Sequence, residues 1–104
     1  MRIAITSDIH GNSWALEAVL YDIAQKGITT IYDLGDSLYG PLDPNGTFDL
    51  ISKSNIISLC GNQDRNIIEN QNGSNGNQTL DFVLQELNVE AINWLKELPR
   101  IRRL

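Results

Sequence analysis

The chain has 104 residues, which is enough for one small domain, and its 41% hydrophobic and 20% charged residues are typical of a globular protein. Its net charge of −5 argues against nucleic acid or an anionic membrane surface as a partner. A single cysteine excludes an intrachain disulfide, and no apolar run reaches the roughly 20 residues of a membrane-spanning helix. We therefore expect a cytoplasmic protein without a signal peptide.

Strands and helices alternate along the first sixty residues. A helix is predicted where Leu16, Val19, Leu20 and Ile23 recur at helical spacing, and a second one begins where Asp43 can act as N-cap. Short apolar or β-branched runs predict the strands. The expected strands are 2–6, 29–34 and 55–60, and the expected helices between them are 13–26 and 44–53. This order predicts right-handed crossovers and a parallel β-α-β-α-β sheet with flanking helices, which is an α/β fold.

The remainder of the chain predicts helices without a strand. Residues 70–78 are rich in Asn, Gly and Gln, and we expect a mobile loop there. A helix over 79–87 with Thr79 as its N-cap should follow, and then a helix over 89–98 that Pro99 ends. We expect this helical pair, 79–98, either to have only a packing role in the fold or to form a wall beside the functional site.

Polar residues follow each of the three predicted strands. Asp8 and His10 come after the first, Asp36 after the second, and Asn62 and Asp64 after the third. Parallel strands bring these positions to one edge of the sheet, where ligands bind in such folds. Taken singly, each residue could cap a turn or lie on the surface. Together they offer carboxylate, imidazole and amide donors of the kind that hold a divalent metal ion.

The motifs D-x-H, G-D and G-N-x-D, each closing a strand, resemble those of the calcineurin-like metallophosphoesterase superfamily, and "SDIHGNSWALEAVL" and "DLGDSLYGPLDPNGTFDLI" are similar to its small prokaryotic phosphodiesterase-type branch. The resemblance implies that Asp8 and His10 bind a first metal, that Asp36 bridges two metals, and that Asn62 binds the second. It also implies that the metals clamp a phosphate and activate water for in-line attack on phosphorus.

The third motif departs from the family pattern. It reads GNQD instead of G-N-H-D/E, so Gln63 stands where the family has a histidine that contacts the phosphate. A glutamine can donate a hydrogen bond but cannot protonate a leaving group. Gln63 is therefore a weaker candidate for a catalytic residue than a histidine would be. The hydrolysis of substrates with good leaving groups should be slowed least. Asp64, which would steady that histidine, is expected either to assist catalysis or to cap the helix that follows.

The complete family site draws further histidines from a later strand and from a G-H-x-H motif, whereas His10 is the only histidine here. The resemblance thus implies the N-terminal half of a four-layer αββα sandwich, and residues 1–104 are expected to form a single, incomplete domain. The complete site would hold two metal ions, and we expect at most one in this chain. Mn²⁺ is the expected ion, with Fe, Ni and Zn as alternatives.

Two functions from different classes stay open. The motifs favour a metal-dependent phosphoesterase that hydrolyses a phosphodiester or phosphomonoester of a small molecule. The histidine count favours a truncated, non-catalytic remnant or binding module for this chain alone. Asn12 and Tyr39 lie near the motifs and are candidate substrate contacts, although Tyr39 could equally pack in the core or at its rim. A sheet without its second half should expose an apolar face, so self-association into a homo-oligomer is a further expectation.

Overall fold

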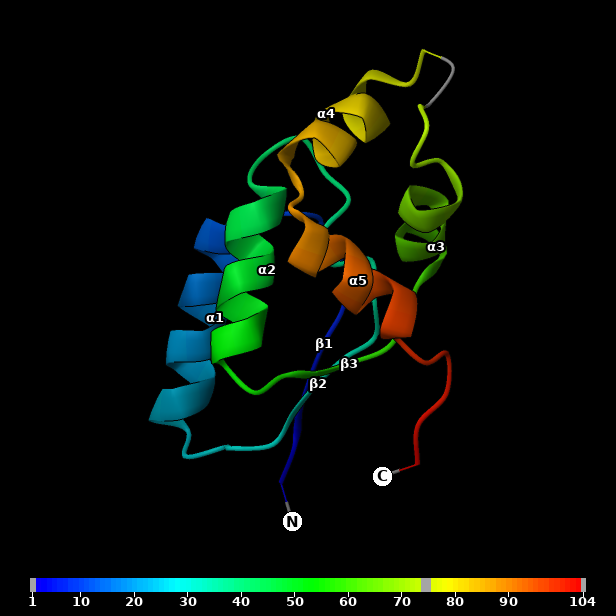
Figure 1. Ribbon diagram of the computed structural model, residues 1–104. Helices are drawn as coiled ribbons and strands as arrows, with labels where there is room; N and C mark the ends of the chain where they lie inside the picture. Colours follow the sequence, from blue (N-terminus) through cyan, green and yellow to red (C-terminus); the bar gives the residue numbers. More distant parts are fainter. Residues whose placement is uncertain (1, 74–75, 104) are drawn as a thin grey trace.

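The computed structural model describes residues 2–73 and 76–103, and its strands and helices alternate as expected before three helices end the chain (Figure 1). The three strands form one parallel sheet in the order β1-β2-β3. The predicted α/β fold is confirmed. The elements are β1 (Ala4–Thr6), α1 (Ser13–Gln25), β2 (Ile31–Asp33), α2 (Pro44–Lys53), β3 (Ile57–Ser58), α3 (Asn62–Glu69), α4 (Gln78–Glu86) and α5 (Val89–Glu97).

Local signals in the sequence set the ends of the first two helices. The Asn12 side chain accepts a hydrogen bond from the backbone N–H of Ala15 and caps α1, and Gly27 follows the end of α1 with φ +70°. Asp43 caps α2 through the N–H of Gly46, and Pro44 takes the first helical position, where no donor is lost. These boundaries match the predictions within one residue.

Other boundaries differ from the predictions. All three strands are shorter than expected, although single backbone hydrogen bonds continue past their ends, from the N–H of Leu34 to the Thr6 carbonyl and from the N–H of Leu59 to the Asp33 carbonyl. Asn77, not Thr79, caps α4: its side chain accepts from the N–H of Leu80, so the cap lies two residues earlier than predicted and the helix starts one residue earlier, at Gln78. The loop that precedes it begins at Asn70, after α3 ends. Ser74 and Asn75, within the expected mobile loop 70–78, lie outside the described residues.

The two faces of the sheet differ in burial. The strand register places Ile5, Tyr32 and Ile57 in one row, and the pleat directs Asp33 and Ser58 to the opposite face. Asp33 and Ser58 are buried, whereas Ile5 is 59% exposed and its two neighbours in the row are half-buried. Right-handed crossovers in a β1-β2-β3 sheet put α1 and α2 on the same face, where they pack against each other (Figure 1). The row with Ile5 therefore marks the less covered face.

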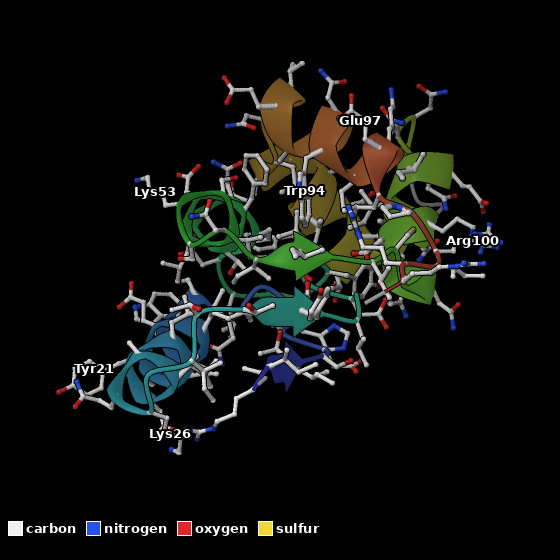
Figure 2. The ribbon with its side chains drawn as sticks, turned by 90° about the horizontal axis from the view of Figure 1, so that it is seen from below. Tyr21, Lys26, Lys53, Trp94, Glu97 and Arg100 are labelled. Carbon is white, nitrogen blue, oxygen red and sulfur yellow. The ribbon has the colours of Figure 1, made fainter. Side chains whose placement is uncertain are left out.

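The C-terminal helices extend the helical layer. α4 packs against α2 and α3, and α5 packs against α3. Phe48 of α2 and Trp94 of α5 hold their rings 5.6 Å apart, and Figure 2 shows Trp94 directed inward while Tyr21 of α1 points outward. The backbone N–H of Cys60 donates to the Pro99 carbonyl, which ties the segment after α5 to the end of β3. None of the described helices is long and apolar enough to cross a membrane.

Candidate metal centre

The loops that follow β1 and β2 are joined by backbone hydrogen bonds beyond the ends of the strands. Asp8 N–H donates to the Gly35 carbonyl at 3.0 Å, and His10 N–H donates to the Asp36 carbonyl at 3.0 Å. Gly11 N–H continues the series to the Ser37 carbonyl at 2.7 Å. The two motif loops therefore form one rigid unit at the carboxyl edge of the sheet, where parallel folds bind their ligands.

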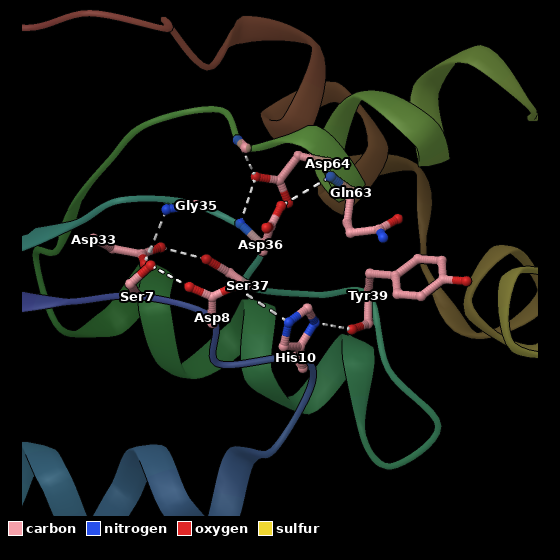
Figure 3. A network of polar contacts seen from close by, with 11 residues as sticks. Ser7, Asp8, His10, Asp33, Gly35, Asp36, Ser37, Tyr39, Gln63 and Asp64 are labelled. Carbon is pink, nitrogen blue, oxygen red and sulfur yellow. Dashed lines mark hydrogen bonds and ion pairs between the residues drawn. The ribbon is translucent and has the colours of Figure 1, made fainter.

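This unit brings the side chains of Asp8, His10 and Asp36 together (Figure 3). One ligand atom from each residue lies within 4.8 Å of the other two, a spacing that lets a single cation touch all three. The His10 Nε2 atom is 3.4 Å from Asp8 Oδ1. Two carboxylates and an imidazole make a donor set that suits Mn, Fe, Ni or Zn. The predicted convergence of these three residues is thus observed.

The backbone at the three residues is in the left-handed region. Asp8, His10 and Asp36 have φ values of 56°, 51° and 59°, and only one other non-glycine residue in the described segments, Asn55, has a positive φ. This conformation is uncommon for residues with a Cβ, and each instance costs on the order of 1–3 kcal/mol that the surrounding structure must offset. Strain concentrated at three converging candidate ligands indicates that the fold is arranged to aim these side chains.

The His10 ring is oriented by the second loop. Its Nδ1 atom lies 2.7 Å from the Tyr39 carbonyl oxygen, and because a carbonyl only accepts, Nδ1 carries the proton. The lone pair of the neutral ring is then on Nε2, the atom that faces Asp8. A histidine that binds metal usually donates its other ring N–H in this way. The tautomer therefore fits a metal ligand.

Asp8 is held in its charged form. The Ser7 hydroxyl donates to Asp8 Oδ2 at 2.5 Å and lowers the pKa of the carboxyl, and the neighbouring His10 lowers this pKa further. An ionised carboxylate is the form that binds a cation. Asp8 is exposed, so the cation would reach it from solvent.

Glycines allow the loops to approach each other. A Cβ on Gly35, which has φ +111°, would lie 2.5 Å from the backbone nitrogen of Gly61, and a Cβ on Gly61 would meet the Asp36 carboxylate. A Cβ on Gly40 would overlap the His10 carbonyl. Side chains at these positions would push the motif loops apart, so the close packing around the site needs glycine.

The third motif supports Asp36 from the opposite side. Asp64 is fully buried, and its Oδ2 atom accepts from the N–H groups of Gly61 at 2.8 Å and Asp36 at 2.9 Å. The Gln63 N–H donates to Asp36 Oδ1 at 2.8 Å. Asp64 thus holds the loop at the start of α3, but it does so from the third position of the helix and not, as the capping interpretation expected, from a position before the helix. Burial raises the pKa of its carboxyl. Asn62, the first residue of α3, is exposed beside these contacts.

A buried carboxylate that the sequence reasoning missed lies beneath the second motif. Asp33 is fully buried at the end of β2 and accepts hydrogen bonds from the Ser37 hydroxyl, from the Ser58 hydroxyl at 3.3 Å and from the Gly35 N–H at 3.3 Å. Burial raises the pKa of its carboxyl. The available signal was an aspartate inside the otherwise apolar strand TTIYDL, where a carboxylate needs donors close by.

The two candidate substrate contacts also have structural partners. The Asn12 side-chain oxygen caps α1, and Asn12 lines a cavity of about 410 Å³ between β1 and α1 that Asp8 also borders. The Tyr39 hydroxyl lies 3.3 Å from the Asn77 side-chain nitrogen, which links the second motif loop to the start of α4. Whether either residue contacts a substrate stays a prediction.

Comparison with known proteins places this site in a family. The sequence matches the calcineurin-like phosphoesterase superfamily domain over residues 1–96. An uncharacterized protein of Methanocaldococcus jannaschii, MJ0912, is 38% identical over 98% of this chain, which spans 39% of that protein. A metallophosphoesterase crystal structure from Sphaerobacter thermophilus superposes with a TM-score of 0.77 and 34% identity, covering 95% of this chain and 42% of its own.

A second solved structure, described as "a putative diadenosine tetraphosphatase", superposes with a TM-score of 0.75 and 26% identity, covering 93% of this chain and 42% of its own. The chain thus spans about two fifths of the length of each of these three proteins. The family match extends over all three motif loops and over most of the described fold. The chain belongs to the calcineurin-like phosphoesterase superfamily.

Proposed function

We propose that Asp8, His10 and Asp36 hold one divalent cation, with Mn²⁺ as the favoured ion, in a centre that hydrolyses a phosphate ester of a small molecule. The observation that carries this proposal is the convergence of three ligand atoms within 4.8 Å, each on a residue held at positive φ. When bound, the cation polarises a phosphoryl oxygen and supplies positive charge where the transition state gains negative charge. Three protein ligands leave coordination positions open for substrate.

The residues of this chain would divide the work of binding and orienting. The Tyr39 carbonyl keeps the proton of His10 on Nδ1, and the hydrogen bond from the Ser7 hydroxyl lowers the pKa of the Asp8 carboxyl. Asp36 is the proposed bridge toward a second metal, for which exposed Asn62 at the start of α3 is a further proposed ligand. A second ion would need donors beyond these two, so this chain should hold at most one.

The substrate class follows from the family and its neighbours. A small phosphodiester or phosphomonoester fits the phosphoesterase family, and a nucleotide-type substrate is consistent with the neighbour described as a diadenosine tetraphosphatase. Gln63 stands in the family's histidine position and cannot deliver a proton, so substrates with acidic leaving groups should react best. An acidic chain of net charge −5 does not favour nucleic acid, and a cytoplasmic location is part of the same proposal.

Calorimetric titration with Mn²⁺ tests the proposal. The wild-type chain should bind one equivalent, and Asp36→Asn should weaken binding at least about tenfold, since losing even an outer partner of a metal ligand costs about 10–100-fold. Asp49→Asn, an exposed carboxylate on α2, is the matched control and should bind as the wild type does. Wild-type binding that Asp36→Asn leaves unchanged would overturn the proposed centre and favour the non-catalytic binding module.

A further inference from the structure

Three side-chain amides form a chain of hydrogen bonds along α3. Asn70 Nδ2 lies 2.8 Å from the Asn66 side-chain oxygen, and Asn66 Nδ2 lies 3.2 Å from Gln63 Oε1. The three residues share one face of the helix because they are spaced three and four positions apart. All three side chains are half-buried. We call Gln63, Asn66 and Asn70 the amide relay.

The direction of the amide relay is fixed at its far end. Asn70 Nδ2 also lies 2.8 Å from the backbone carbonyl of Asn66, which can only accept a hydrogen bond. Turning the Asn70 amide around would set two acceptor oxygens 2.8 Å apart. Asn70 therefore donates to the Asn66 side-chain oxygen, which leaves the Asn66 nitrogen to donate to Gln63 Oε1. Each amide orients the next without any charged group.

The last member of the relay lies beside the candidate metal centre. The Gln63 backbone N–H donates to Asp36 Oδ1 at 2.8 Å, so its residue adjoins one of the three proposed ligands. In Figure 3 the Gln63 side chain extends from α3 toward the ring of Tyr39, whose carbonyl orients His10. Because Oε1 is occupied by Asn66, the free end of the Gln63 amide is its NH₂ group.

We propose that Asn66 and Asn70 are positioning residues: at a position where the family pattern already implies a phosphate contact, they fix the polarity of the Gln63 amide so that its NH₂ group, and not its oxygen, is offered to a phosphoryl oxygen of the substrate. This inference rests on the proposed phosphoesterase function. A freely rotating glutamine would offer its oxygen to an anion as often as its nitrogen, and an oxygen repels phosphate. The relay fixes the orientation of the Gln63 amide before the substrate binds. The oxygen is then not offered to the anion, and the entropy cost of ordering the side chain on binding is removed.

A double-mutant cycle on phosphate binding tests the amide relay. With Mn²⁺ at saturation, inorganic phosphate is titrated by calorimetry. Gln63→Ala should weaken phosphate about tenfold, the size of one hydrogen bond to a charged oxygen. Asn66→Leu should weaken it several-fold in the wild-type background and not at all in the Gln63→Ala background. Gln71→Leu is the neutral control: the Gln71 side-chain nitrogen donates to the Ile68 carbonyl at 3.0 Å, outside the amide relay, so this variant should bind phosphate normally.

A second readout needs neither metal nor turnover. The side-chain NH₂ signals of the relay are followed by NMR in the metal-free chain, and Asn70→Leu should shift the Gln63 signal while Gln71→Leu should not. Full phosphate affinity in Asn66→Leu, or equal losses in both backgrounds of the cycle, would overturn the role of the relay while Mn²⁺ binding remained. Absence of Mn²⁺ binding in the wild type would instead overturn the proposed function itself.

Discussion

The carboxyl edge of the sheet and the face that carries Ile5 lie a few residues apart and are built in opposite ways. At the edge, Asp8, His10 and Asp36 are held by backbone bonds from a neighbouring loop, and added Cβ atoms at the adjoining glycines would collide with backbone. On the face, Ile5 is 59% exposed in a half-buried row. The strained backbone at the carboxyl edge costs stability but fixes the polar side chains, whereas the face with Ile5 leaves apolar side chains in contact with water.

The arrangement of the candidate site therefore does not require that the less covered face of the sheet be covered. All of the contacts that orient the three proposed ligands come from residues 7–64. The uncovered row, in contrast, has the character of a surface that another polypeptide would cover. The chain can therefore hold the three candidate ligands in place even though it spans about two fifths of the length of the relatives described above.

The largest expected effect is a loss of stability when a side chain is added at the closely packed carboxyl edge of the sheet. Gly35→Ala should destabilise the fold by about 3 kcal/mol or more, because its Cβ would meet Gly61 backbone and its φ of +111° suits only glycine. Gly27→Ala is the matched control: its φ is also positive, but its Cβ would meet open space, so the cost should be only about 1 kcal/mol. Urea unfolding measures both. Equal losses would mean that the edge is not tightly packed.

Introducing a proton donor at position 63 should raise the rate of hydrolysis at this edge of the sheet. Gln63→His should raise Mn²⁺-dependent hydrolysis of a phosphodiester with a poor leaving group by about tenfold or more, because a general acid contributes about 10²–10⁴-fold where proton transfer limits the rate. An activated aryl phosphodiester, which leaves without protonation, should gain little. Parallel rates for the two substrates would show that proton donation is not what the chain lacks.

The exposed row should govern association between chains. We expect sedimentation of the wild type to show a larger species as concentration rises, and Ile5→Lys should shift it toward monomer, since a charge cannot be buried in an apolar contact at low cost. Ile101→Lys removes an equally apolar side chain that is 84% exposed elsewhere and should leave association unchanged. A wild type that stays monomeric at every concentration would contradict this expectation.

The smallest expected effect is on pH dependence. Burial raises the pKa of Asp33 above its unfolded value of 3.8, so the native state binds more protons than the unfolded state just above that pH. The free energy of unfolding contributed by this group therefore falls as pH rises through that region. Asp33→Asn should reduce the pH dependence of the free energy of unfolding, measured by urea unfolding between pH 4 and 7. Asp49→Asn, which changes an exposed carboxylate, should not reduce it. An unchanged slope would mean that Asp33 titrates normally.

The parts that could be predicted from the sequence are those that local chemistry determines. Asp43 followed by Pro44 specified a helix start, and the recurrence of polar residues after each strand predicted that Asp8, His10 and Asp36 would meet. Parallel topology makes such convergence necessary once the strands are identified.

Other features depend on contacts between distant segments. The His10 ring is oriented by the Tyr39 carbonyl, 29 residues away in the sequence. The buried Asp33 carboxylate accepts a hydrogen bond from Ser58 on the neighbouring strand. The cap of α4 is Asn77, although Thr79, two residues later, is also a residue type that can cap a helix, so the sequence left two adequate caps open. The amide relay was likewise beyond prediction, because its direction depends on a bond to one backbone carbonyl.

We propose that Asp8, His10 and Asp36 form a metal centre in this chain without further ligands from elsewhere. The decisive experiment is to grow crystals with Mn²⁺ and to measure anomalous scattering at the manganese edge. We expect one anomalous peak within bonding distance of an Asp8 oxygen, His10 Nε2 and an Asp36 oxygen, at about 2.0–2.3 Å from each. A well-ordered site without such a peak, or a peak bound elsewhere on the chain, would contradict it.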